Sequence, residues 1–169
     1  MKHAHLILII GLLVFGLAPS SQAAEAIGWI EHVQLPQNLL LQAKIDTGAD
    51  NASIHAEHIQ VVEHNGTRMV KFSVANKKGE SVNYELPLVR YTSIKRKGAA
   101  PLQRPVVSMN LCLGHTLRTV NINLANRKNF KYRVLIGRSY LKDLYLVDSS
   151  KQYTAEPSCQ GQLAQKVDL

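Results

Sequence analysis

The sequence predicts an all-β domain, built as an antiparallel barrel or a sandwich-like fold. Short apolar stretches recur at regular spacing, turn signals separate them, and no segments of helical period lie between them. The chain of 169 residues has the length of one domain with one hydrophobic core. A hydrophobic content of 46% with 19% charged residues is typical of a globular protein and argues against disorder.

Residues 1–23 have the organisation of a secretory signal peptide. Lys2 and nearby histidines form a cationic start, residues 6–18 are almost wholly apolar, and Ser21-Gln22-Ala23 fits a small-x-small cleavage site. An apolar run of about a dozen residues is too short for an ordinary membrane span. We therefore expect an exported protein, which for a bacterial chain means periplasmic or secreted, with no stable membrane span after cleavage. An uncleaved N-terminal anchor is the alternative.

Strand signals follow in order after the leader. The clearest is a hairpin at Asn65-Gly66, a pair that favours a two-residue type I′ turn, and Gly114-His115 marks a second hairpin. Residues 138–144 have the only plausible helical pattern. The predicted strands are residues 30–33, 39–45, 59–64, 67–74, 81–89, 106–113, 117–124 and 132–136, the last being the final long strand.

Residues 90–105 interrupt this rhythm, because they carry five basic residues around Gly98-Ala99-Ala100-Pro101 with little alternation. Most charge runs of this kind are solvated surface loops. Elsewhere, Cys112 and Cys159 are the only cysteines, and an exported protein permits a disulfide between them. The alternative is one buried thiol and one loose thiol in the tail.

Two segments carry the functional signal. In Lys44-Ile45-Asp46-Thr47-Gly48-Ala49-Asp50, an aspartate follows an apolar run, as at the end of a buried strand. On its own the triplet also fits an ordinary strand-to-turn junction. The second segment, Val134-Leu135-Ile136-Gly137-Arg138-Ser139-Tyr140-Leu141, is an apolar strand followed by glycine, arginine and the helical pattern.

Together the two segments resemble the retropepsin-like aspartic peptidases. The wider chain, from about residue 27 to 153, is similar to a bacterial branch often labelled ATP-dependent zinc proteases. Its further marks are Gly28-Trp29-Ile30-Glu31, His55-Ala56 and Leu146-Val147-Asp148. The resemblance implies a closed β-barrel with one short C-terminal helix over residues 24–153, followed by a polar tail over residues 154–169. It also offers a second interpretation of residues 90–105, as the flap that closes over substrate.

The resemblance implies an endopeptidase that uses two carboxylates sharing one proton to activate water. The chain has a single Asp-Thr-Gly, so the pair requires a homodimer with one aspartate from each copy. The roles implied are catalysis at Asp46, Thr47 and Gly48, peptide or protein substrate binding at Ala49 and Asp50, and bracing of the loop by Ile136, Gly137 and Arg138.

Other chemistries lack support in the sequence. No His-Glu-x-x-His or phosphate-binding glycine loop is present. The histidines at positions 55, 58 and 64 cluster in sequence, but the pair at 55 and 58 that could share a face is only half a zinc site. We therefore expect no metal and no cofactor. The net charge of +8 favours acidic partners, and nucleic acid is not expected because aromatic residues are only 6%. If residues 90–105 form a flap, acidic substrates would be favoured. The alternative function is a non-catalytic β module that binds peptides or a partner protein.

Overall fold

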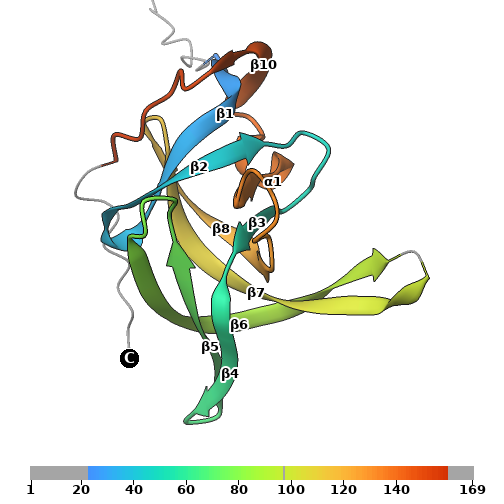
Figure 1. The fold of residues 1–169 in the computed structure, drawn as a ribbon. Helices are drawn as coiled ribbons and strands as arrows, with labels where there is room; N and C mark the ends of the chain where they lie inside the picture. The colour runs from blue at the N-terminus through green and yellow to red at the C-terminus, as the bar shows by residue number, and fades with distance from the viewer. Residues whose placement is uncertain (1–22, 97, 160–169) are drawn as a thin grey trace, which may run out of the picture.

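The computed structural model describes residues 23–96 and 98–159. The predicted leader therefore lies almost entirely outside the described residues, as does the end of the predicted tail. Within them, strands dominate and one short helix is present (Figure 1), which confirms the all-β prediction. The elements are β1 (Glu25–Leu35), a 3-10 turn (Pro36–Asn38), β2 (Leu39–Ile45), β3 (Ala52–His55), β4 (Glu57–His64), β5 (Thr67–Ala75), β6 (Ser81–Arg96), β7 (Ala99–Leu113), β8 (Thr116–Ala125), β9 (Val134–Ile136), α1 (Arg138–Leu141) and β10 (Tyr145–Gln152).

The strands form one sheet in the order β10-β1-β2-β9-β3-β8-β7-β6-β5-β4. An additional pairing of Gln34 in β1 with Cys112 in β7 closes six of these strands into a ring. The closed barrel expected from the sequence thus corresponds to a ring that one residue pair completes. The apolar residues of the ring strands make up most of the main buried cluster, which includes Ile27, Val33, Leu35, Ile54, Met109, Leu111, Ile122 and Ile136.

Residues 90–105 are not an irregular loop. The first half of β6 pairs with β5, and its second half, from Leu88, pairs with β7 as far as Arg96 opposite Ala99. The paired parts of β6 and β7 project from the rest of the molecule as a two-stranded hairpin (Figure 1). We call this hairpin, residues 88–96 and 98–107, the arm. The charge run hid a strand here, because many side chains of a projecting hairpin are exposed on either face.

The C-terminal part also departs from the expected boundaries. The predicted strand at residues 132–136 is only three residues long, and it is not the last, because β10 follows α1 and pairs in parallel with β1. The helix was predicted correctly, although it ends at Leu141. β3 was not predicted; all four of its residues are buried, so it shows no alternation. β9 is held between β2 and β3, which places Gly137 next to the end of β2.

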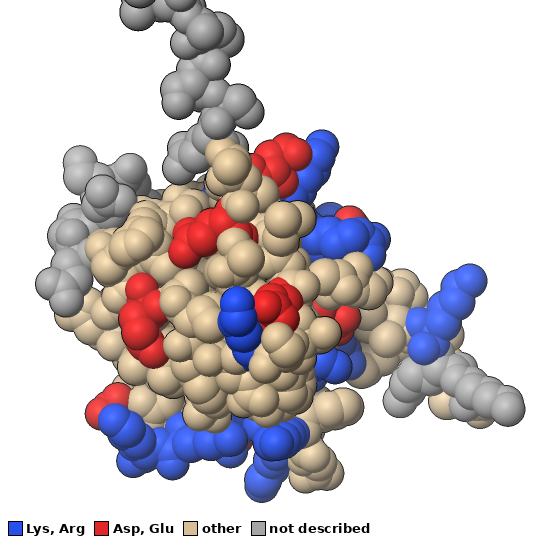
Figure 2. Space-filling model, turned by 90° about the horizontal axis from the view of Figure 1, so that it is seen from above, with Lys and Arg blue, Asp and Glu red and all other residues tan. Residues whose placement is uncertain are grey.

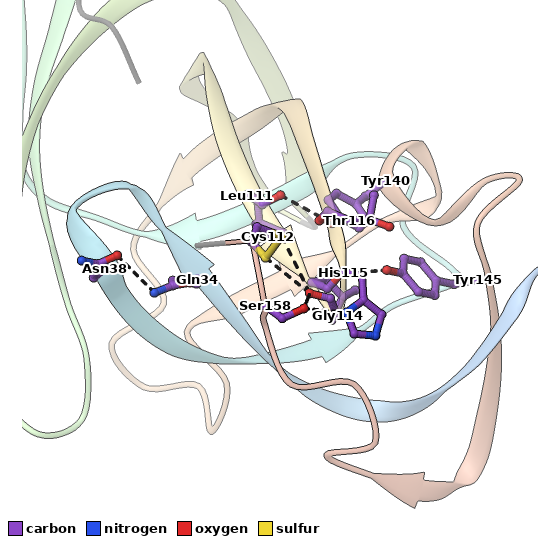
Figure 3. Close-up of a disulfide and its surroundings, with 12 residues drawn as sticks. Gln34, Asn38, Leu111, Cys112, Gly114, His115, Thr116, Tyr140, Tyr145 and Ser158 are labelled. Carbon is purple, nitrogen blue, oxygen red and sulfur yellow. Dashed lines mark hydrogen bonds between the residues drawn. A yellow bond between two sulfur atoms is a disulfide. The ribbon is translucent and has the colours of Figure 1, made fainter. Parts of the chain in front are cut away.

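Residues 153–159, which follow β10, are bonded to the ring. Cys112 and Cys159 form a disulfide, as the sequence suggested, and it joins residues 47 positions apart (Figure 3). Ser158 beside it donates its main-chain N–H to the Gly114 oxygen over 2.8 Å. Upstream, the buried Glu31 carboxylate accepts bonds from both Thr154 and Ala155. Residues 154–159 therefore pack as part of the domain.

No helix among the described residues is long and apolar enough to cross a membrane.

Candidate active site

Asp46 lies directly after β2, at a point where the main chain is fixed. β2 is paired on one side with β1 and on the other with β9, and its residues alternate between buried and more exposed positions. The Asp46 N–H donates to the Ile136 oxygen over 2.9 Å, so the β2–β9 pairing continues to the aspartate itself. Asp46 is half-buried. The strand pair thus holds a carboxylate at the edge of the core with access to solvent.

The residues after Asp46 form a tight loop that turns around its carboxylate. Gly48 donates its N–H to Asp46 Oδ1 over 3.2 Å, and Ala49 donates to the Asp46 main-chain oxygen over 3.2 Å. A Cβ on Gly48 would lie 3.3 Å from Asp46 Oδ1. Thr47 and Gly48 are exposed. We call residues 46–51 the aspartate loop.

The start of α1 is hydrogen-bonded to the main chain of the aspartate loop. Arg138 and Ser139 donate their N–H groups to the oxygens of Ala49 and Asp50, each over 2.9 Å. At Gly137, a Cβ would lie 2.7 Å from the Asn51 oxygen, so this close approach of two main chains requires glycine. The structure therefore brings together the two segments that the sequence singled out, Asp46 to Asp50 and Ile136 to Arg138.

The Arg138 side chain contacts the loop mainly through the main chain. Its Nη1 donates to the Thr47 oxygen over 2.9 Å. Its contact with Asp50 is longer, 3.7 Å from Nη2 to Oδ1, and the two side chains are 53% and 72% exposed. An exposed ion pair of this length contributes little stability, about 0 to 1 kcal/mol. Arg138 therefore braces the loop chiefly through its bond to the Thr47 main-chain oxygen.

Three cavities adjoin the aspartate loop. Asp46 lines one of about 380 Å³, together with Trp29, Lys44 and Phe130. Asp50 lines another of about 250 Å³, opposite Arg90 and Arg104. A third, of about 480 Å³ and mainly apolar, extends from Thr47 along α1 and β10. The loop therefore lies at the junction of several open surfaces, as a site that binds an extended ligand requires.

Arg127 is a site residue that sequence reasoning missed. It lines both the 380 Å³ and the 250 Å³ cavity. Burial and the nearby Arg104 lower the pKa of Arg127, and the negative charge of Asp46 acts in the opposite direction. The residues around it, Asn126 and Lys128, form no recognisable motif, so only the fold reveals its position.

The three histidines that the sequence analysis considered for a zinc site each contact a different residue. His55 is buried and contacts Glu57, His58 contacts Ser73, and His64 contacts Glu85. Across the part of the chain that the structure describes, no group of three or more His, Cys, Asp or Glu residues could hold a metal ion.

Known proteins are similar to this chain over most of its length. A family model, RimB-like, described as "Retropepsin-like aspartic endopeptidase RimB", matches residues 26–158. A crystal structure of a Legionella pneumophila protein of unknown function is similar, with 36% identity and a TM-score of 0.67, covering 78% of this chain and 98% of that one.

Longer relatives are also similar. Probable alpha-L-glutamate ligases from Shewanella pealeana and Desulfotalea psychrophila are 29% and 28% identical over 67% and 66% of this chain. The chain spans about a quarter of the length of these relatives, 25% in each. The matching model covers most of the chain and includes the aspartate loop and its brace. The chain therefore belongs to the RimB-like family of retropepsin-like proteins.

Proposed function

We propose that this protein is an exported, homodimeric aspartic endopeptidase, with one Asp46 from each protomer in a shared active site. The observation that carries the proposal is the arrangement of the aspartate loop. The main chain of Asp46 is bonded to β9, its carboxylate accepts the N–H of Gly48, and the start of α1 braces the loop. Family membership supports the same function.

The chemistry follows from placing two such carboxylates close together. Two like charges a few ångströms apart do not both ionise cheaply, so the pair retains one proton. The ionised Asp46 takes a proton from a bound water, which attacks the peptide carbonyl. The protonated Asp46 of the other copy donates toward the developing oxyanion. The proton count is conserved, and the pair titrates as a unit.

A second copy has a suitable place to dock. Thr47 and Gly48 are exposed at the tip of the aspartate loop, while β9 and the start of α1 hold its base. In a two-fold dimer the two loops would meet tip to tip, with Thr47 bonding across the axis. The exposed tip is thus available for the contact that would complete the carboxylate pair.

The arm is the proposed flap. Arg90, Thr92 and Ile94 occupy alternate positions of β6 and line the 250 Å³ cavity opposite the aspartate loop. One face of the arm is therefore directed toward the site, as a closing flap requires. An extended peptide between loop and arm would present its main chain to Ala49 and Asp50.

We further propose that the substrates are acidic peptides, with glutamate the favoured residue. Lys and Arg side chains are visible on the arm and along one edge of the face in Figure 2, and Arg90, Arg104 and Arg127 line the cavity beside the aspartate loop. The similar ligases are named for alpha-L-glutamate. The disulfide suits an oxidising compartment, which supports action in the periplasm or outside the cell.

The test uses Asp46→Asn, which keeps the shape of the side chain and removes its charge. Wild type and variant are assayed on unfolded proteins and on acidic peptides from about pH 3 to 7, the range in which a shared-proton pair is competent. We expect cleavage by wild type, inhibition by pepstatin-type inhibitors and loss of cleavage in the variant. Asp143→Asn, at an exposed turn position, is the matched control and should retain activity.

No cleavage by wild type over this range would reject the peptidase. The alternative, a non-catalytic module that binds peptides or a partner protein, would then stand in its place. Persistent cleavage by Asp46→Asn would also reject the proposed role of Asp46.

A further inference from the structure

We infer that Arg127 is a specificity-determining residue that holds a carboxylate side chain of the substrate beside the catalytic Asp46, with Arg104 as the second cation of the same subsite. This rests on the proposed function, and it assigns to particular residues the recognition of substrate charge.

The position of Arg127 is the first support. Arg127 and Leu135 are the two residues that line both the Asp46 cavity and the cavity under the arm. A peptide that reaches from Asp46 toward the arm therefore passes Arg127. Since Asp46 and Arg127 share a cavity, the side chain that Arg127 contacts belongs to a residue near the scissile bond.

The stem of Arg127 is held while the end of its guanidinium stays available. Its main-chain N–H donates to Nδ1 of the buried His55 over 3.0 Å. The Cζ atom lies 4.6 Å from the centroid of the Phe130 ring, and Nε donates to the Tyr132 oxygen over 3.4 Å. Within the described residues the Nη groups have no hydrogen-bond acceptor. A guanidinium held in this way can bind a carboxylate with little loss of side-chain freedom.

Arg104 lines the cavity under the arm together with Arg127. Its Nη1 donates to Asn123 Oδ1 over 3.4 Å, whereas its Nε is buried and has no partner in the described part of the chain. A buried unpaired donor is costly, and two adjacent guanidinium groups repel each other. A bound carboxylate would relieve both costs. Arg90, which is exposed, lies at the rim of the same cavity.

The experiment compares peptides that differ only in charge. Peptides cleaved by wild type are resynthesised with each Glu within two residues of the scissile bond replaced by Gln. We expect wild type to prefer Glu, and Arg127→Ala to lower kcat/KM for the Glu peptide by about 10- to 100-fold, the value of a charge-assisted hydrogen bond. Cleavage of the Gln peptide should change little, and Arg127→Lys should restore part of the preference. Lys128→Ala, an exposed neighbouring cation, is the control.

A binding measurement keeps the subsite testable without catalysis. An acetylated and amidated octapeptide with two central glutamates, and its glutamine twin, are titrated into Asp46→Asn protein by calorimetry, with and without Arg127→Ala. Tighter binding of the glutamate peptide that disappears with Arg127→Ala supports the subsite, even if wild type cleaves nothing and the proposed function fails. Arg104→Gln should weaken the same binding if Arg127→Ala does not fold. An unchanged Glu-over-Gln ratio in folded variants would overturn the inference.

Discussion

Arg138 donates from Nη1 to the main-chain oxygen of Thr47 over 2.9 Å, so the base of the site holds the tip of the aspartate loop. The same guanidinium is 3.7 Å from the exposed Asp50 carboxylate. The first contact is a charge-assisted hydrogen bond and the second is an exposed ion pair. The hydrogen bond is expected to contribute more to stability than the ion pair.

Removal of each partner should separate the two contacts. We expect Arg138→Ala to lower the free energy of unfolding by about 1 to 2 kcal/mol, since a hydrogen bond from a charged group is lost. Asp50→Asn should change it by less than about 1 kcal/mol. Urea unfolding of the two variants measures this difference. A larger loss for Asp50→Asn would show that the ion pair, not the bond to Thr47, braces the loop.

Substitution of the two glycines of the site should affect different properties, stability at Gly137 and catalysis at Gly48. Gly137→Ala places a Cβ 2.7 Å from the Asn51 oxygen, and we expect a loss of about 1 to 3 kcal/mol of stability from this overlap. In Gly48→Ala the new atom lies 3.3 Å from Asp46 Oδ1, so kcat should fall while stability changes little. Thermal unfolding and peptide cleavage are measured on both. A stable, active Gly137→Ala protein would contradict the close approach described here.

Glu31 is expected to be the strongest single link between β1 and the C-terminal segment. Its buried carboxylate accepts from Gly28 N over 2.6 Å, Thr154 N over 3.0 Å, Thr154 Oγ1 over 2.8 Å and Ala155 N over 3.0 Å. Glu31→Gln turns one acceptor into a donor that faces other donors, which should cost about 3 kcal/mol. The exposed Glu156, which contacts His32, is the control, and Glu156→Gln should cost less than about 1 kcal/mol. Equal effects in denaturant unfolding would refute this role of Glu31.

Stability should fall at alkaline pH because three tyrosines, Tyr84, Tyr140 and Tyr145, are buried in hydrogen-bonded positions. Burial raises the pKa of Tyr84 and of Tyr140, whose hydroxyls donate to the oxygens of Pro36 and Thr116 over 2.8 Å each. The unfolded chain ionises these groups near pH 10, so their contribution is complete below about pH 10 and is lost as pH rises further. Tyrosinate absorbance, followed with circular dichroism, checks this. Full ionisation of all six tyrosines in a folded chain would contradict it.

Local patterns predicted the elements that depend on local chemistry. β2 has the predicted bounds, because its residues alternate between the core and more exposed positions. The hairpin at Asn65-Gly66 also formed where expected, since both turn residues adopt positive φ, 49° and 79°. Elements that depend on distant partners were missed. β3 is wholly buried between β8 and β9, and β10 is a largely exposed edge strand held by β1.

The site residues also fall into those that local sequence predicts and those that only the fold brings together. The aspartate loop and the Gly137-Arg138 brace could be found because each is contiguous in sequence, and glycine at 137 is required by main-chain contact. The arm was hidden because Arg90, Thr92 and Ile94 share one face without sharing polarity. Arg127 shares a cavity with Asp46 because β8 pairs with β3 and β3 pairs with β9, an arrangement that no spacing in the sequence encodes.

Mixing wild-type and Asp46→Asn chains tests most directly whether the active site is shared between two copies. After unfolding and refolding equal amounts together, only wild-type pairs would carry both carboxylates. We predict about one quarter of the activity of the same total amount of wild-type chain, as random pairing in a two-fold dimer requires. Activity of about one half, as expected for independent sites, would contradict a shared site in a two-fold dimer.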